Sequence, residues 1–313
     1  MKEKGRGKGE RSMDLQKELD IAIKNLELKG DPSLKSGYRM DEYRVYDTYL
    51  ENTYWDQFKN NIKQLYPAAY EMFNEGSGKE LEERKVGRYI FPPKMASFGS
   101  SSRMLFNLAK DIAGFQFEEK LPTTVGGVAH MDGFWEKEEE YIFVEAKCRE
   151  PYVKKDNIIE VKYKELYQYI TESDTTPVCC KIEDRPGGKM KVFFQSGDTH
   201  IEYFDIKQMI SHFLGIGTAL LNGRYEEKAV RFLYLLFNPT KIEFEQESVR
   251  ELICETYEKV CAECNSIDFK QLFHEILVFL QVRKGLGQEK DIDTLLEGFA
   301  FTLCDQENYL DKN

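Results

Sequence analysis

The chain has 313 residues, of which 41% are hydrophobic and 32% are charged, and its formal net charge is −11. This composition can bury a core and excludes wholesale disorder. No window approaches the roughly 20 consecutive apolar residues of a membrane helix, and the basic start lacks the apolar segment of a secretory signal. The acidic balance argues against a protein coated in nucleic acid, but it leaves room for a local basic cleft and for carboxylates that hold a metal.

Seven cysteines with no secretory signal in front of them favour a reducing compartment over a disulfide framework. We therefore expect a cytoplasmic protein that does not associate with membranes. The acidic charge and the helical segments at both ends of the chain favour a protein partner, either a second copy of the chain or another protein.

The first third of the chain reads mainly as helix. Residues 1–13 are rich in Gly, Lys, Arg and Glu and predict a flexible tail. Apolar residues at helical spacing predict a helix over about residues 14–28. A second helical stretch is expected over residues 40–74, interrupted at Pro67, so that residues 14–95 form a helical N-terminal region.

The pattern then changes to strands mixed with helices. This order, helix, three strands, helix, strand, predicts an α/β fold in which a mixed sheet is flanked by helices. The expected elements are a helix that begins at the serine run 100–102 and ends near Ala113, strands at 115–124, 128–135 and 141–148, a helix at 205–221 and a strand at 230–237.

We expect this core to span residues 96–240 with an insertion at residues 151–203. Within the insertion, the Tyr-rich segment 158–170 predicts a helix, and Pro186-Gly187-Gly188 predicts the turn of a hairpin. Residues 241–313 read as a helical C-terminal region.

The strand segment YIFVEAK, residues 141–147, carries the most informative chemistry. Side chains alternate between the two faces of a strand, so Glu145 and Lys147 share one face. Ile142, Val144 and Ala146 lie on the other face, where they would pack against a helix layer. A carboxylate and an ammonium at the end of an apolar strand are costly to bury unless they are paired or bound to something.

The preceding strand is expected to pair with this one through a short charged turn. If Glu136 faces Tyr141, then Asp132 lies opposite Glu145, and His130 lies opposite Lys147. Two neighbouring carboxylates repel unless a cation lies between them or one is protonated. Mg²⁺ prefers such oxygen ligands, and the nearby lysine could orient a water or stabilise a phosphate oxygen. The pattern indicates metal-assisted phosphodiester hydrolysis.

Asp132 followed by Glu145-Ala146-Lys147 on the next strand resembles the PD-(D/E)XK nuclease superfamily. More of the chain is similar to a bacterial restriction-endonuclease-like family within it. The similar segments are SFGSSSRMLFNLAKD, FVEAKCREP and QMISH, the last followed by RFLYLLFNPT. The resemblance covers about residues 96–240 without the insertion, and it implies an αβββαβ restriction-endonuclease-like core with helical additions at both ends.

The resemblance also implies an activity, that of a Mg²⁺-dependent endonuclease that hydrolyses DNA phosphodiester bonds in restriction or defence. Asp132 and Glu145 would ligate Mg²⁺, or Mn²⁺ in its place, and the backbone carbonyl of Ala146 would be a third ligand. Lys147 would assist the attacking water. Accessory or phosphate-contacting roles would belong to Ser101, Ser102, Asn107, His130, Gln208 and His212.

Two departures and a second function class stay open. Met131 stands where the superfamily name has proline, and the upstream helix lacks a glutamate that many members carry, for which Glu118 or Glu119 is an alternative. The carboxylate and lysine set also fits an exposed hairpin with an ordinary charge pair, and the serine run fits a simple helix N-cap. The second function class is a non-cleaving nucleic-acid-binding or protein-interaction module that keeps the nuclease fold.

The insertion begins directly after the strand that carries Glu145 and Lys147. Its tyrosines lie among several lysines, and both residue types contact sugar and phosphate in nucleic-acid complexes. We therefore predict that it forms one wall of a DNA cleft. The alternative is a surface elaboration whose tyrosines pack inward.

Overall fold

The computed structural model describes residues 8–40, 44–76, 79–225 and 228–308. Residues 1–7 of the predicted tail lie outside the described residues. The flexible-tail prediction was wrong for residues 8–13, which belong to the first helix, α1 (Lys8–Gly30).

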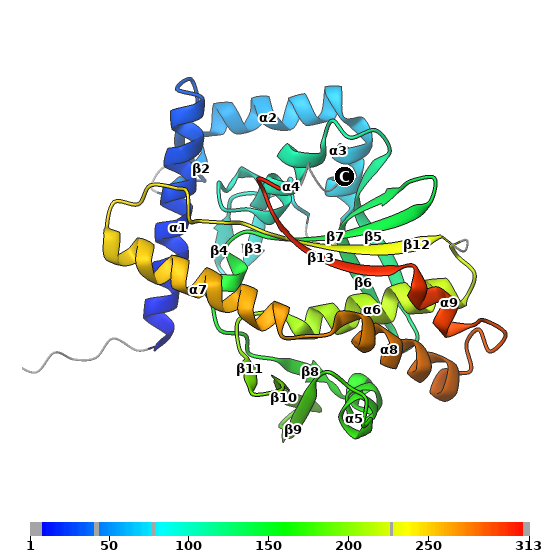
Figure 1. Ribbon diagram of the computed structural model, residues 1–313. Coiled ribbons are helices and arrows are strands. Elements are labelled where there is room, and N and C mark those ends of the chain that lie inside the picture. Colours follow the sequence, from blue (N-terminus) through cyan, green and yellow to red (C-terminus); the bar gives the residue numbers. More distant parts are fainter. Residues whose placement is uncertain (1–7, 41–43, 77–78, 226–227, 309–313) are drawn as a thin grey trace, which may run out of the picture.

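A five-stranded mixed sheet forms the centre of the molecule (Figure 1), in the order β13-β12-β7-β6-β5. In this sheet β5, β6 and β7 form an antiparallel meander, and β12 and β13 run parallel to β7 and to each other. The protein is therefore an α/β protein with a mixed sheet flanked by helices, as predicted. The strands are β5 (Phe115–Thr123), β6 (Gly127–Glu136), β7 (Glu140–Lys147), β12 (Ala229–Leu236) and β13 (Phe299–Asp305).

The alternation of side chains in β7 divides the hydrophobic core into two clusters. Tyr141 and Phe143 belong to one cluster, together with helices α6 (Ile206–Leu221) and α8 (Phe269–Lys284). Ile142, Val144 and Ala146 belong to the other cluster, with α4 (Ser101–Ala109) and the N-terminal helices. The prediction that these apolar residues face a helix layer is confirmed.

Glycines let α6 lie close to its neighbours. A Cβ on Gly215 would stand 2.8 Å from the Ala129 Cβ of β6, and one on Gly217 would stand 2.9 Å from Leu280 of α8. Glycine within a helix costs about 0.5–1 kcal/mol relative to alanine, so at these two positions closer packing of α6 against the sheet and α8 offsets that cost.

The N-terminal region contains two hairpins as well as helices, so its purely helical interpretation was wrong. Residues 45–50, VYDTYL, are rich in aromatic and β-branched residues and form a strand rather than a helix. The helix predicted over residues 40–74 therefore begins only at residue 52. The elements are β1 (Ser36–Arg39), β2 (Val45–Leu50), α2 (Asn52–Leu65), α3 (Pro67–Glu75), β3 (Arg84–Val86) and β4 (Tyr89–Phe91).

The insertion forms a second, small sheet with one helix, at the bottom of Figure 1. The hairpin predicted around residues 186–188 is confirmed, because β9 and β10 pair across that turn. The helix predicted over residues 158–170 is wrong in its first half, since residues 158–160 pair with β10 instead. The elements are β8 (Ile158–Glu160), α5 (Lys164–Glu172), β9 (Cys179–Arg185), β10 (Lys189–Ser196) and β11 (Thr199–Ile201).

The C-terminal region is helical except at its end. Helices α7 (Glu247–Asn265), α8 and α9 (Ile292–Glu297) precede β13, which adds the fifth strand to the central sheet. The wholly helical prediction for residues 241–313 was therefore wrong for residues 299–305. None of the helices in the described part of the chain has the length and apolar character to cross a bilayer.

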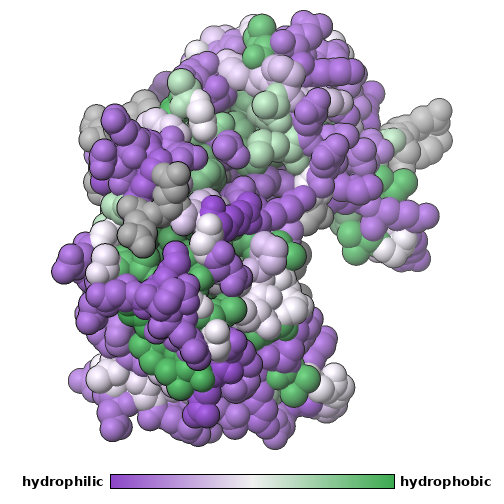
Figure 2. Space-filling view, turned by 90° about the vertical axis from the view of Figure 1, so that its right-hand side faces the viewer, coloured by the Kyte–Doolittle hydropathy of each residue, from purple (hydrophilic) through white to green (hydrophobic). Residues whose placement is uncertain are grey.

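The face on the right of Figure 1 is mostly hydrophilic with smaller hydrophobic areas (Figure 2).

Candidate active site

Asp132 and Glu145 are brought together where β6 and β7 separate. Glu136 faces Tyr141, as predicted, and the ladder between β6 and β7 ends at the pair Gly133–Val144. Beyond it, the Oδ2 atom of Asp132 accepts the backbone N–H of Ala146 at 2.8 Å. The side chain thus satisfies a strand N–H that no longer has a backbone partner across the ladder.

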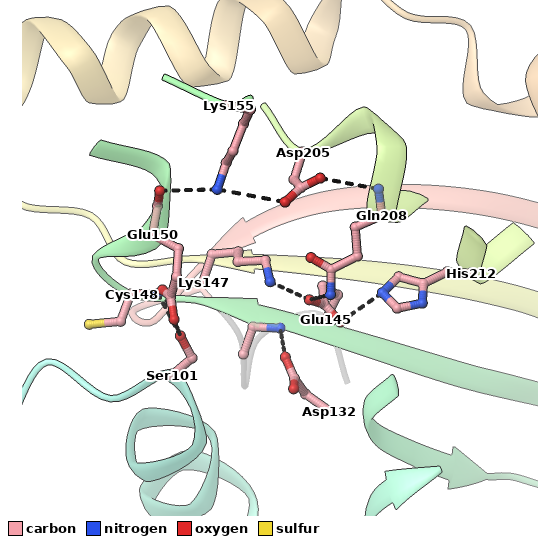
Figure 3. Close-up of polar contacts among 11 residues, drawn as sticks. Ser101, Asp132, Glu145, Lys147, Cys148, Glu150, Lys155, Asp205, Gln208 and His212 are labelled. Carbon is pink, nitrogen blue, oxygen red and sulfur yellow. Dashed lines mark hydrogen bonds and ion pairs between the residues drawn. The ribbon is translucent and has the colours of Figure 1, made fainter. Parts of the chain in front are cut away.

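Glu145 lies at the centre of the polar contacts in Figure 3, and its side chain is 1% exposed. Lys147 Nζ lies 2.5 Å from Oε1, which also accepts a hydrogen bond from Gln208 Nε2 at 2.6 Å. On the other side, Nε2 of His212 lies 2.9 Å from Oε2. Both carboxylate oxygens are therefore engaged.

Helix α6 supplies two of these partners because Gln208 and His212 are four residues apart and lie on one helix face. Asp205 caps the helix by accepting the Gln208 N–H at 3.1 Å, which fixes the first turn. The ring of His212 lies over Phe232 of β12, and its buried Nδ1 has no hydrogen-bond partner among the described residues.

The electrostatics of the two carboxyl groups differ. Burial, and then the negative charge of Glu145, raise the pKa of Asp132 well above its usual value. Burial alone would also raise the pKa of Glu145, but Lys147 and His212 outweigh it and lower the pKa to about 2. The two acids in turn outweigh burial at Lys147 and raise its pKa, so this lysine stays an ammonium at neutral pH.

A second polar network lies beside the first. The Ser101 hydroxyl donates to the Glu150 carboxylate at 2.9 Å, and the Cys148 backbone N–H is shared between these two residues. Lys155 donates to the Glu150 carbonyl at 3.1 Å and approaches Asp205 at 3.6 Å, which connects this network to the start of α6 (Figure 3).

Both networks border one cavity of about 610 Å³. The end of β7 lines it, and most of its other residues come from α1, from the segment between α3 and α4, and from the start of α4. The charged lining residues are Lys17, Asp20, Glu80, Arg84, Lys94, Asp132, Glu145, Lys147, Arg149 and Glu150.

Most of the predicted site residues meet here. The cavity is lined by Asp132, Glu145 and Lys147 together with Ala146, Ser101, Ser102 and Gln208. His212 is not part of this lining and contacts the Glu145 carboxylate from α6. Ser100 caps α4, as the N-cap interpretation predicts, and the Ser101 hydroxyl donates to Glu150. The accessory or phosphate-contacting role of Ser101 and Ser102 stays a prediction.

Four candidates are not brought to the cavity. Asn107 is exposed on α4. His130 is also exposed and lies opposite Lys120 on β5, and the β6–β7 ladder ends at Gly133–Val144, before it reaches His130 and Lys147. The Glu118 carboxylate lies directly against Gly76, and Glu119 pairs with Arg224 at 2.5 Å. The structure thus gives neither glutamate a place as a further metal ligand.

Sequence reasoning missed part of the site. Glu150 stands in the quoted FVEAKCREP segment, which was a usable signal. Asp20 of α1 pairs with Arg149 at 2.5 Å, and burial raises its pKa to about 6 although Arg149 opposes that rise. Nothing in the local pattern of α1 distinguishes this residue from an ordinary helix carboxylate.

The residues present fit a hard divalent cation through two carboxylates. Among the described residues, no three or more His, Cys, Asp or Glu side chains are grouped to hold a metal. Mg²⁺, however, is commonly bound through one or two carboxylates together with waters and a substrate phosphate. Asp132 and Glu145 supply that number, and the raised pKa of Asp132 marks a pair of acids that a cation would stabilise.

Comparison with known protein families, with curated proteins and with solved structures finds no match for this chain.

Proposed function

We propose that the protein is a Mg²⁺-dependent endonuclease that hydrolyses DNA phosphodiester bonds. The observation that supports this most is the placement of Asp132 beside Glu145 and Lys147 at the end of β7, inside a polar cavity. The element order α4, β5, β6, β7, α6, β12 is the order expected for the αβββαβ nuclease core. The resemblance to restriction-endonuclease-like proteins is the ground for a restriction or defence role.

Asp132 and Glu145 would hold the metal, with the Ala146 carbonyl as a third ligand. When bound, the ion supplies a more acidic water and neutralises charge on the phosphate. Because its pKa is raised, Lys147 acts as an ammonium that donates hydrogen bonds to the water or to a phosphate oxygen, and it does not take up a proton. Gln208 and His212 hold the Glu145 carboxylate in place from α6.

The test is a cleavage assay on diverse DNA with Mg²⁺ and with Mn²⁺. We expect the wild-type protein to nick plasmid DNA only with metal, and Lys147→Ala and Asp132→Asn to lose this activity. Lys189→Ala, an exposed lysine on β10, is the matched control and should cleave normally. Asp132→Asn should stay folded, because it removes a like-charge neighbour of Glu145.

One observation favours a second candidate, a DNA-binding module that does not cleave. Both Glu145 oxygens already have partners, and a carboxylate whose lone pairs are used is a weaker metal ligand. Calorimetric titration with Mg²⁺ separates the two. Binding that is lost in Asp132→Asn supports the nuclease, whereas DNA binding without metal binding or cleavage supports the module.

A further inference from the structure

The hairpin formed by β3 and β4 is a concentrated basic element in an acidic protein. Its first five residues, Arg84-Lys85-Val86-Gly87-Arg88, contain three cations and no acid, while the whole chain has a net charge of −11. A two-residue turn joins the strands, since Val86 pairs directly with Tyr89. Gly87 takes a φ of 61°, which a residue with a side chain seldom adopts, and so permits this tight turn.

The surface of this hairpin combines cations with exposed apolar groups. Val86, Tyr89 and Ile90 are 58%, 38% and 44% exposed. The Arg88 guanidinium lies 5.0 Å from the centre of the Tyr89 ring and donates a hydrogen bond to its hydroxyl at 2.8 Å. Arg44, from the strand β2 side, lies over the same ring at 5.1 Å. A planar guanidinium held on an aromatic ring is pre-organised to donate two hydrogen bonds to the oxygens of a phosphate.

The hairpin continues into the cavity of the candidate site. Arg84 lines that cavity, and its buried Nε has no hydrogen-bond partner among the described residues. Three other cations of the cavity have carboxylate partners, in the pairs Lys94–Glu80, Arg149–Asp20 and Lys147–Glu145.

Arg84 and Lys17 differ from these three, because the described part of the chain gives neither of them an ion pair. A buried N–H donor without an acceptor is costly. An incoming phosphate oxygen would satisfy Arg84.

We propose that the β3–β4 hairpin binds the phosphate backbone of the DNA strand that enters the cavity, with Arg84 at the cavity rim and Lys85 and Arg88 further along the strand. This deepens the proposed function and rests on it. Lys85 has no partner among the described residues, and Arg88 contacts only the Tyr89 side chain, so both charges are available to DNA.

The experiment measures binding by fluorescence anisotropy of a labelled DNA duplex of about 30 base pairs, at several salt concentrations. All proteins carry Lys147→Ala, so that Mg²⁺ can be present without cleavage. Arg84→Gln/Lys85→Gln/Arg88→Gln is compared with Lys154→Gln/Lys162→Gln/Lys164→Gln. The two triple variants change the net charge equally, and every lysine of the control pairs with a carboxylate of the insertion.

We expect the hairpin variant to bind at least about tenfold more weakly, and the slope of log K against log salt to shrink by about 2.7, since each phosphate contact contributes about 0.9. The control should keep both quantities. Circular dichroism of each variant checks the fold. Equal losses in the two variants, or no loss in the hairpin variant, overturn the proposal.

Failure of this proposal and failure of the proposed function are distinguishable. Wild-type cleavage together with unchanged binding by the hairpin variant overturns the hairpin assignment alone. Hairpin-dependent binding without any wild-type cleavage supports the hairpin and overturns the nuclease.

Discussion

The β3–β4 hairpin and the insertion both carry basic and aromatic residues, but they use them differently. In the insertion most of the lysines pair with carboxylates, as Lys162 does with Glu160 and Lys164 with Asp184. Its tyrosines pack inward, with Tyr167 against Phe194 and Tyr169 against Phe279. In the hairpin the cations lack carboxylate partners among the described residues. The number of lysines in a segment therefore does not measure the positive charge that it offers to DNA.

The packing of the insertion favours its alternative interpretation. Its inward-packed tyrosines match the alternative of a surface elaboration, and its helix α5 is tied to α8 through the Lys284–Glu165 pair. Lys155 is the exception, because it points toward Glu150 and Asp205 at the site. The predicted role of the insertion as a cleft wall stays a prediction, and the hairpin is the better-supported candidate for backbone contact.

The largest expected effect is on the rate of DNA cleavage, and it distinguishes loss of the chemical step from loss of DNA binding. Lys147→Ala should lower kcat for DNA cleavage by about 10²–10⁴-fold, since it removes a charge that acts on the reacting phosphate or water. The hairpin triple variant should instead raise KM, because phosphate contacts far from the reacting bond hold substrate and transition state alike. Steady-state kinetics check both. A kcat loss in the hairpin variant as large as that of Lys147→Ala would contradict the division of roles.

The next effect concerns stability. Glu263 of α7 accepts the backbone N–H groups of Tyr203 and Phe204, both at 2.8 Å, and so holds the end of the insertion against the core. Glu263→Ala should lower the free energy of unfolding by about 2–4 kcal/mol, because two N–H groups lose their acceptor. Lys85→Gln on the exposed hairpin should change it by less than about 0.5 kcal/mol. Urea denaturation measures both, and similar values for the two variants would contradict the comparison.

A third effect depends on pH. Asp20, which lines the same cavity as Arg84 of the hairpin, has its pKa raised to about 6 by burial. Because the folded state holds this proton more tightly than the unfolded chain does, the free energy of unfolding should fall as pH rises from about 4 to 6.

Asp20→Asn should remove about 2–3 kcal/mol of that fall, which corresponds to a pKa difference of about 2 units. Glu202→Gln, which removes an exposed carboxylate of the insertion, is measured alongside as the control for the loss of one negative charge. Denaturation at a series of pH values tests this. A slope in Asp20→Asn equal to that of the wild type would remove Asp20 as its source.

The sequence predicted the meander β5–β7, α6 and β12 because these elements have strong local patterns and short turns. It did not predict β13, since the alternation in FAFTLCD becomes a strand only through parallel pairing with β12. Similarly, the approach of Asp132 to Glu145 followed from register, whereas Asp20 and Arg84 reach the cavity through tertiary packing of distant segments. Whether the cations of the hairpin have carboxylate partners likewise depends on which distant segments pack beside them.

The smallest effect tests the one lysine of the insertion that reaches the site. Lys155 approaches Asp205, whose carboxylate caps α6 through the Gln208 N–H. Lys155→Met would remove a counter-charge but leave that cap, so Gln208 should shift only slightly, and kcat should fall by about tenfold at most. Lys154→Met, which affects the exposed pair with Glu202 and the contact with the Tyr203 ring, should leave kcat unchanged. A loss of several hundredfold in Lys155→Met would show that the insertion takes part in the chemistry, and equal rates for the two variants would place Lys155 with the other paired surface lysines.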